Sequence, residues 1–99
     1  MSEVQVELEE STNDFLKALA SPARQRVMFL FAGGAELSVG DVAEQAGIGQ
    51  STASQQLALL RRGHILTSRR EGKTVYYRAD TAGTAVVLEN LQAYLRSCC

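Results

Sequence analysis

The chain has 99 residues, of which 45% are hydrophobic and 21% charged, and its formal net charge is −1. A chain of this length predicts one domain over residues 1–99 with a small core. It contains no apolar run near the roughly 20 residues that cross a bilayer, and residues 1–10 lack the basic and apolar parts of a secretory signal. We therefore expect a cytoplasmic protein without a membrane partner.

Charge is distributed unevenly along the chain. Residues 1–14 contain five acidic residues and no basic one, whereas residues 61–78 contain six basic residues and a single acid, Glu71. A local basic patch attracts anions even on a slightly negative protein. Taken alone, this patch fits either contact with nucleic acid or an ordinary solvated hairpin.

Two helices are expected in the first third of the chain. Ser21 is placed to cap a second helix, with Pro22 in its first turn, and Gly33 and Gly34 end it. We expect this second helix to be buried. Residues 8–19 have the spacing of an amphipathic first helix, whose apolar face comprises Leu8, Thr12, Phe15, Leu16 and Leu19.

A helix-turn-helix pattern follows. Ser38 stands three residues before Asp41, as in a capping box, and opens a short third helix. Gly47 supplies a left-handed exit, and a fourth helix is expected to start near Gln50. Two short helices joined by one glycine turn are typical of DNA-binding helix-turn-helix units.

The fourth helix has one apolar and one polar face. At 100° per residue the core stripe is Ala53, Leu57 and Leu60, and Thr52 with Gln55 is expected to form a second capping box. Glutamine can bond adenine in two places, and serine or threonine can bond bases or phosphates. Equally, polar residues at a helix start can simply cap it and stay hydrated. The outward face comprises Ser51, Gln55, Ala58 and Arg62, flanked by Gln50, Ser54 and Gln56.

A basic hairpin is expected next. Residues 65–69 and 74–78 have strand composition, and the "REGK" between them contains the glycine of a short turn. Arg69, Arg70 and Lys73 are expected to project outward, where they could contact phosphates. A polar helix followed by a basic hairpin is the order of a winged helix-turn-helix. We expect a mainly α fold of about five helices plus a two-stranded wing.

From about Leu16 to Leu95 the chain resembles the ArsR/SmtB family of small dimeric bacterial winged-helix repressors. The likeness is carried by "LKALASPARQRVMFLF", "ELSVGDVAEQAGIGQSTASQQLALLRR" and "SRREGKTVYYRA", in that order. It implies a homodimer joined through the first and last helices, a fourth helix in the DNA major groove, and an inducer that releases DNA. By position, it implies base and phosphate contacts from Gln50, Ser51, Thr52, Ser54, Gln55 and Gln56, and wing contacts from Arg69, Arg70 and Lys73.

The usual sensing sites of this family are missing. Ser38 and Gly40 stand where many metal sensors have two cysteines, and residues 80–96 contain no histidine to join Asp80 in a metal site. "GIGQSTASQQLALLRR" and "GKTVYYRA" look closest to the sulfur- and redox-sensing branch, whose second-helix cysteine is replaced by Phe29. No metal is therefore expected at the usual family positions, and no cofactor is certain.

Cys98 and Cys99 are the remaining candidate sensors. An adjacent pair could bind a thiophilic metalloid such as arsenite, oxidise, or cross-link two subunits. The alternative is a frayed terminus without a sensing role. A smaller open point is whether Gly63 or His64 takes the left-handed exit of the fourth helix.

The last helix, in residues 80–99, is expected to begin at a Thr81 cap and to present more apolar surface than one small domain can bury. Dimerisation explains this surface, and a two-fold dimer predicts an operator that is an imperfect inverted repeat. The alternatives are a winged-helix module that binds a protein partner and a regulator without an inducer. An enzyme is not expected, because the chain has one histidine, no G-x-S-x-G elbow and no phosphate-binding loop. The apolar residues are Val86, Val87, Leu88, Leu91, Tyr94 and Leu95.

Overall fold

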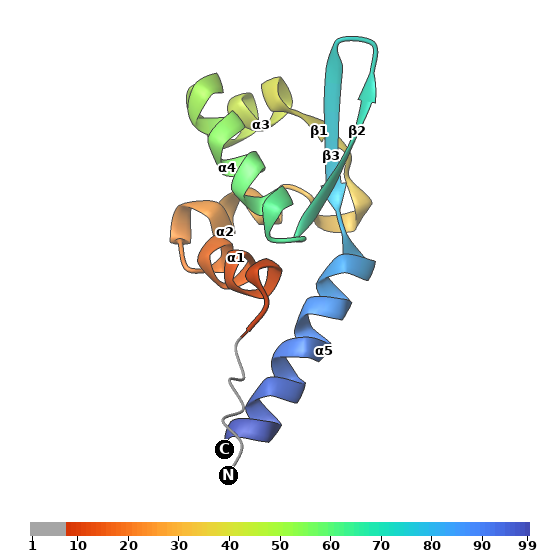
Figure 1. The fold of residues 1–99 in the computed structure, drawn as a ribbon. Helices are drawn as coiled ribbons and strands as arrows, with labels where there is room; N and C mark the ends of the chain where they lie inside the picture. The colour runs from red at the N-terminus through yellow and green to blue at the C-terminus, as the bar shows by residue number, and fades with distance from the viewer. Residues whose placement is uncertain (1–7) are drawn as a thin grey trace.

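The computed structural model describes residues 8–99, so the acidic residues Glu3 and Glu7 lie outside the described part. Four helices pack together, a hairpin extends along one side of them, and the last helix runs toward the opposite end of the molecule (Figure 1). The helices are α1 (Glu10–Leu19), α2 (Pro22–Phe29), α3 (Val39–Ala46), α4 (Gln50–Arg62) and α5 (Thr81–Cys98). The other elements are a 3₁₀ turn η1 (Ala32–Gly34) and the strands β1 (Leu37–Ser38), β2 (Leu66–Glu71) and β3 (Thr74–Ala79).

The sheet has three antiparallel strands in the order β1-β3-β2. The predicted hairpin is confirmed as β2 and β3, each slightly longer than expected, with Gly72 at a φ of 62° in the turn. The expectation of a two-stranded wing missed β1, in which Leu37 pairs with Tyr77 and Ser38 with Tyr76. A lone hairpin is marginal in water, and this third strand ties the base of the hairpin to the chain before α3.

The hydrophobic core is centred on α4. Its predicted stripe of Ala53, Leu57 and Leu60 is fully buried, and it packs with Phe15 of α1 and Val42 of α3. Burial of such side chains is the main stabilising contribution in a domain of this size. The stripe therefore fixes which face of α4 points outward.

Most helix ends follow the sequence signals. The Ser21 hydroxyl accepts from the backbone N–H of Arg24, and Ser38 with Asp41 forms a reciprocal capping box. Gly47 ends α3 in the left-handed conformation, with a φ of 67°.

Two predicted caps are wrong. The N-cap of α4 is Gly49 and no side chain of residues 8–99 caps it, so Thr52 and Gln55 form no capping box. The N-cap of α5 is Asp80 rather than Thr81, and its carboxylate accepts the N–H of Gly83 at 2.9 Å. Helix α4 starts at Gln50, as predicted, and α5 starts at Thr81, so each candidate cap residue lies inside the first turn of its helix.

The second helix is shorter and more exposed than predicted. It ends at Phe29, because the N–H groups of Leu30 and Phe31 bond to carbonyls three residues back and tighten the last turn. Val27 is its one buried residue, while Phe29 is 82% exposed. The expectation of a buried helix is therefore wrong for the single protomer.

The exit of α4 is taken by His64, whose φ is 63°. Gly63 has an ordinary φ of −82° but is buried against α1. A Cβ at Gly63 would lie 3.0 Å from the backbone oxygen of Asp14 and 3.0 Å from Cα of Phe15. Position 63 therefore requires glycine because two backbones approach closely there. The strained left-handed conformation falls on the next residue, His64.

Helix α5 leaves most of its apolar side chains uncovered. Val87 is buried, but Val86, Leu88 and Leu95 are 57%, 49% and 52% exposed. Across residues 8–99, no helix is both long enough and apolar enough to span a membrane. The protomer thus carries a helix whose apolar surface is only partly used.

Candidate nucleic-acid interface

The outward face of α4 carries polar side chains, apart from Ala58. Because its opposite stripe is fully buried, the face is held in one orientation relative to the core. Gln56 is half-buried, and the other predicted DNA-reading residues on this helix are exposed: Gln50, Ser51, Thr52, Ser54, Gln55 and Arg62.

The N-terminal end of α4 adds backbone donors to this face. Its N-cap, Gly49, has an extended backbone and no side chain of residues 8–99 bonds to the first turn. The first backbone N–H groups of a helix have no partner within the helix, and together with the helix dipole they favour an anion. A phosphate is therefore chemically suited to this end of α4.

Gln56 is oriented by a residue that the sequence analysis did not single out. Nη1 of Arg24 donates to Oε1 of Gln56 at 3.3 Å, while Nε and Nη2 of Arg24 donate to the carbonyls of Ala18 and Lys17 at 3.0 and 2.8 Å. One guanidinium thus binds the C-terminal end of α1 and a side chain of α4. The cluster leaves the Gln56 Nε2 group as the free donor of that amide.

The three predicted wing cations differ in their surroundings. All three are exposed, and Arg70 and Lys73 make no salt bridge among residues 8–99. Arg69 instead forms two parallel hydrogen bonds to Glu36, at 2.8 and 2.9 Å, and a third to Glu71 at 3.0 Å. Of the three, Arg69 is therefore the one already occupied by carboxylates.

Electrostatics and stacking reinforce the position of Arg69. Its guanidinium carbon lies 4.8 Å from the centre of the Tyr76 ring. Hydrogen bonding to Arg69 holds the pKa of Glu36 below its usual range, and the bonds to Glu36 and Glu71 raise the pKa of Arg69. The pair is therefore ionised at neutral pH.

The α4 face and the hairpin lie at the same end of the protomer. In Figure 1 the N-terminal end of α4 and the tip of the β2–β3 hairpin both point toward the top, with α3 between them, while α5 descends to the bottom. The polar helix and the basic ribbon are thus brought to one end of the fold, as the sequence predicted.

Cys98 and Cys99 lie at the other end. Both are exposed free thiols at the end of α5, with their Sγ atoms 2.7 Å apart. Hydrogen bonding to Cys99 raises the pKa of the Cys98 thiol, which disfavours its thiolate. In the described part of the chain, no group of three or more potential ligands could hold a metal ion.

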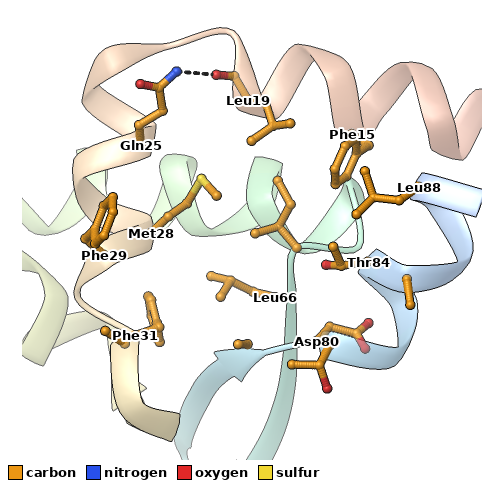
Figure 2. A pocket seen from close by; sticks show the side chains of 15 residues that line it. Phe15, Leu19, Gln25, Met28, Phe29, Phe31, Leu66, Asp80, Thr84 and Leu88 are labelled. Atoms are coloured by element: carbon orange, nitrogen blue, oxygen red, sulfur yellow. Dashed lines mark hydrogen bonds between the residues drawn. The ribbon is translucent and has the colours of Figure 1, made fainter. Parts of the chain in front are cut away.

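An apolar cavity of about 890 Å³ lies between α2 and α5. Figure 2 shows Met28 and Phe29 on α2 across from Leu88 on α5, with Leu66 at the base. Phe29, which stands in place of the expected second-helix cysteine, is at the edge of this cavity. Three of the polar side chains that line it are already engaged: Gln25 donates to the carbonyl of Leu19 at 2.7 Å, Thr84 donates to that of His64 at 3.0 Å, and Asp80 accepts the N–H of Gly83.

The sequence alone did not identify two residues that contact the α4 face and the hairpin, Arg24 and Glu36. Each bonds to a residue more than 30 positions away. The only local signals were a long cation in the first turn of a helix and an isolated acid just before a strand. Neither signal indicates which distant residue the side chain will bond to.

Comparison with known proteins identifies the family. A helix-turn-helix domain model matches residues 19–69. The chain is 38% identical over 88 residues to the biofilm growth-associated repressor of Xylella fastidiosa, covering 86% of this chain and 76% of that one. It is 42% identical over 78 residues to the repressor of the same name in Agrobacterium fabrum, covering 79% and 66% of the two chains.

A solved structure shares the whole fold. It is the homodimeric winged helix-turn-helix DNA-binding domain of a possible ArsR-family transcriptional regulator from Mycobacterium bovis. The TM-score is 0.71 at 26% sequence identity, over 99% of this chain and 93% of that one. With the matching domain and relatives, this shows that the chain belongs to the ArsR/SmtB family of winged helix-turn-helix transcriptional repressors, which are DNA-binding regulators rather than enzymes.

Proposed function

We propose that this chain is a homodimeric, sequence-specific repressor that reads an imperfect inverted repeat through α4. The observation that carries the proposal is the outward polar face of α4, held in place by the fully buried Ala53, Leu57 and Leu60. Small and amide side chains on such a face fit the major groove and can bond base edges. The proposed reading residues are Gln50, Ser51, Thr52, Ser54, Gln55 and Gln56.

The hairpin is proposed to contact the DNA backbone next to that groove. Arg70 and Lys73 are exposed cations near its tip, and Arg62 is exposed at the end of α4. Contacts of this kind raise affinity and fix register, and they carry little sequence information.

Dimerisation is proposed through α1 and α5. Leu16, Val86, Leu88 and Leu95 are all exposed apolar residues on these two helices, and α1 and α5 pack against each other in the protomer. The Mycobacterium bovis relative is homodimeric, which supports a dimer. A two-fold axis would present two copies of α4 to two half-sites about one DNA turn, or a multiple of it, apart.

The test is a gel-shift titration against a panel of operator variants. Gln55→Ala should change the preference among base pairs at one position of each half-site, at a cost of roughly 1 to 3 kcal/mol for the preferred operator. Gln45→Ala is the matched control, since Gln45 is an exposed glutamine on α3 and lies outside the proposed reading and dimerisation surfaces. Equal behaviour of the two variants on every operator would contradict the proposed role of α4.

The rival function is a winged-helix module that binds a protein. It predicts an affinity that hardly changes with salt, whereas binding to a duplex weakens steeply in proportion to the phosphates contacted. The exposed cations of the hairpin favour the duplex, and a flat salt dependence would favour the rival.

A second, finer candidate is release from the operator by a thiol-directed signal at Cys98 and Cys99. Their exposure and proximity favour it, because two thiolates can bind a metalloid such as arsenite or be oxidised together. Operator affinity should be measured with arsenite, a persulfide donor and peroxide, for the full chain and for a chain ending at Ser97. A response lost on truncation would support the thiols, and an unchanged response would place the signal elsewhere or leave an inducer-independent regulator.

A further inference from the structure

Arg69 is the best-anchored cation of the hairpin, and its anchoring conflicts with a role as a phosphate contact. We infer that Arg69 is a positioning residue that fixes the hairpin to the chain before β1. Because Glu36 pairs with Arg69, the positive charge of Arg69 is not available to DNA phosphates. The phosphate contacts of the hairpin then come from Arg70 and Lys73. This inference rests on the proposed function and assigns different roles within the same basic segment.

The strand register places Arg69 and Arg70 on opposite faces of the sheet. Arg69 is opposite Tyr76, and Ser68 is opposite Tyr77, which packs against the hydrophobic core. Successive side chains of a strand alternate between faces, so Arg70 shares the face of Ser68 and Tyr77, on the side of the helical core. Arg69 lies on the other face.

The positive charge of Arg69 is already more than offset by its two carboxylate partners. The guanidinium donates two bonds to Glu36 and one to Glu71, and it lies over the ring of Tyr76. One cation shared between two carboxylates leaves a local charge of −1. A phosphate approaching this point meets a neutralised side chain, whereas Arg70 and Lys73 make no salt bridge among residues 8–99.

The same contacts explain what Arg69 does instead. Glu36 immediately precedes β1, which pairs with β3, while Arg69 lies on β2 at the far edge of the sheet. The ion pair therefore crosses the whole sheet and joins its two outer strands. A two-pronged guanidinium–carboxylate contact fixes direction as well as distance, which a lysine cannot reproduce.

The experiment measures the slope of log affinity against log salt for the full chain on its preferred operator. Each lost phosphate contact flattens this slope by about 0.9, hence by about 1.8 in a dimer that loses two. Arg70→Met and Lys73→Met should each flatten it by that amount. Arg69→Met should leave the slope unchanged and weaken binding roughly threefold to tenfold at every salt concentration, because the hairpin loses its anchor.

Two further variants separate charge from geometry. Arg69→Lys keeps the charge but loses the two-pronged contact, so it should behave like Arg69→Met, and amide exchange at β2 should quicken in both. Glu36→Gln should free Arg69 to contact DNA and steepen the slope by up to about 1.8. A slope flattened by Arg69→Met and restored by Arg69→Lys would overturn the inference. If Arg70→Met and Lys73→Met also left the slope unchanged, the proposed contact of the hairpin with the DNA backbone would fail, and a slope near zero for the native chain would contradict the proposed function itself.

Discussion

Arg24 of α2 and Gln56 of α4 are joined by a hydrogen bond, with Nη1 of Arg24 3.3 Å from Oε1 of Gln56. The same guanidinium donates to two carbonyls at the end of α1, so it links the helix proposed for dimerisation to the helix proposed for DNA reading. The bond from Arg24 uses one lone pair of Oε1 and fixes the orientation of the amide, with Nε2 as its free donor group. Adenine is read in two places by an amide that both donates and accepts, so the bond from Arg24 competes with the acceptor half of that contact.

Replacing Arg24 should affect both stability and specificity. Arg24→Met removes the cation that satisfies the carbonyls of Lys17 and Ala18, and we expect a loss of about 1 to 2 kcal/mol in the free energy of unfolding, since these bonds are charge-assisted but partly hydrated. It also frees Oε1 of Gln56, which should shift operator preference toward adenine at one position. Urea denaturation and a binding panel check the two effects.

Gln56→Ala serves as the control for that experiment. It should alter operator preference while leaving the α1 carbonyl bonds intact, so its stability loss should be below that of Arg24→Met. Additive effects on operator preference in the double variant would show that the two side chains act separately.

A substitution at Thr12 is expected to stabilise the protein. It is fully buried in α1, and its hydroxyl has no hydrogen-bond partner among residues 8–99. Thr12→Val keeps the shape and removes the desolvated hydroxyl, which should stabilise the protein by about 1 kcal/mol. Thr12→Ser keeps the hydroxyl and removes the methyl group, so it should lower the melting temperature. A lower melting temperature for Thr12→Val would mean that the hydroxyl is satisfied in solution.

A substitution at Gly63 is expected to destabilise the protein. Gly63→Ala places a Cβ 3.0 Å from the backbone of Asp14 and Phe15, where neither backbone can yield cheaply, and should cost about 1 to 3 kcal/mol. The neighbouring His64→Gly is the matched control. It relieves about 1 to 2 kcal/mol of left-handed strain against an entropy cost of about 0.5 to 1 kcal/mol, so it should be neutral or slightly stabilising. Thermal unfolding of both variants shows whether the close backbone contact at Gly63 or the left-handed conformation at His64 has the larger effect on stability.

The Glu36–Arg69 pair predicts a pH dependence at the acidic end. The pKa of Glu36 is lowered in the folded protein, so the contribution of the pair to stability is complete above the unfolded pKa, about 4.3, and is lost as the pH falls through the lower folded value. The difference in stability between the native chain and Glu36→Gln should therefore be constant from pH 7 to about pH 5 and vanish in stronger acid. A difference that persisted at low pH would exclude ionisation of Glu36 as its source.

The local signals of the sequence predicted much of the fold. Ser21, the Ser38–Asp41 box and Gly47 mark helix ends through bonds within four residues, and the stripe of α4 follows from its period. These features need no knowledge of distant partners. The outward polar face of α4 follows from the same stripe.

The missed features depend on distant parts of the chain. Strand β1 has two residues and exists only because Tyr76 and Tyr77 pair with it. The contacts of Arg69 with Glu36 and of Arg24 with Gln56 join residues 33 and 32 positions apart. Charge counting therefore found the basic segment but could not tell which of its cations is already neutralised.

Ser38 belongs to two elements at once, as the last residue of β1 and the N-cap of α3. Its backbone pairs with Tyr76 of the hairpin, while its side chain holds the first turn of the helix that supports α4. A tilt of the hairpin must therefore pull on α3. The ribbon and the reading helix would meet a duplex as a single preformed shape, so that association would have little loop entropy to overcome.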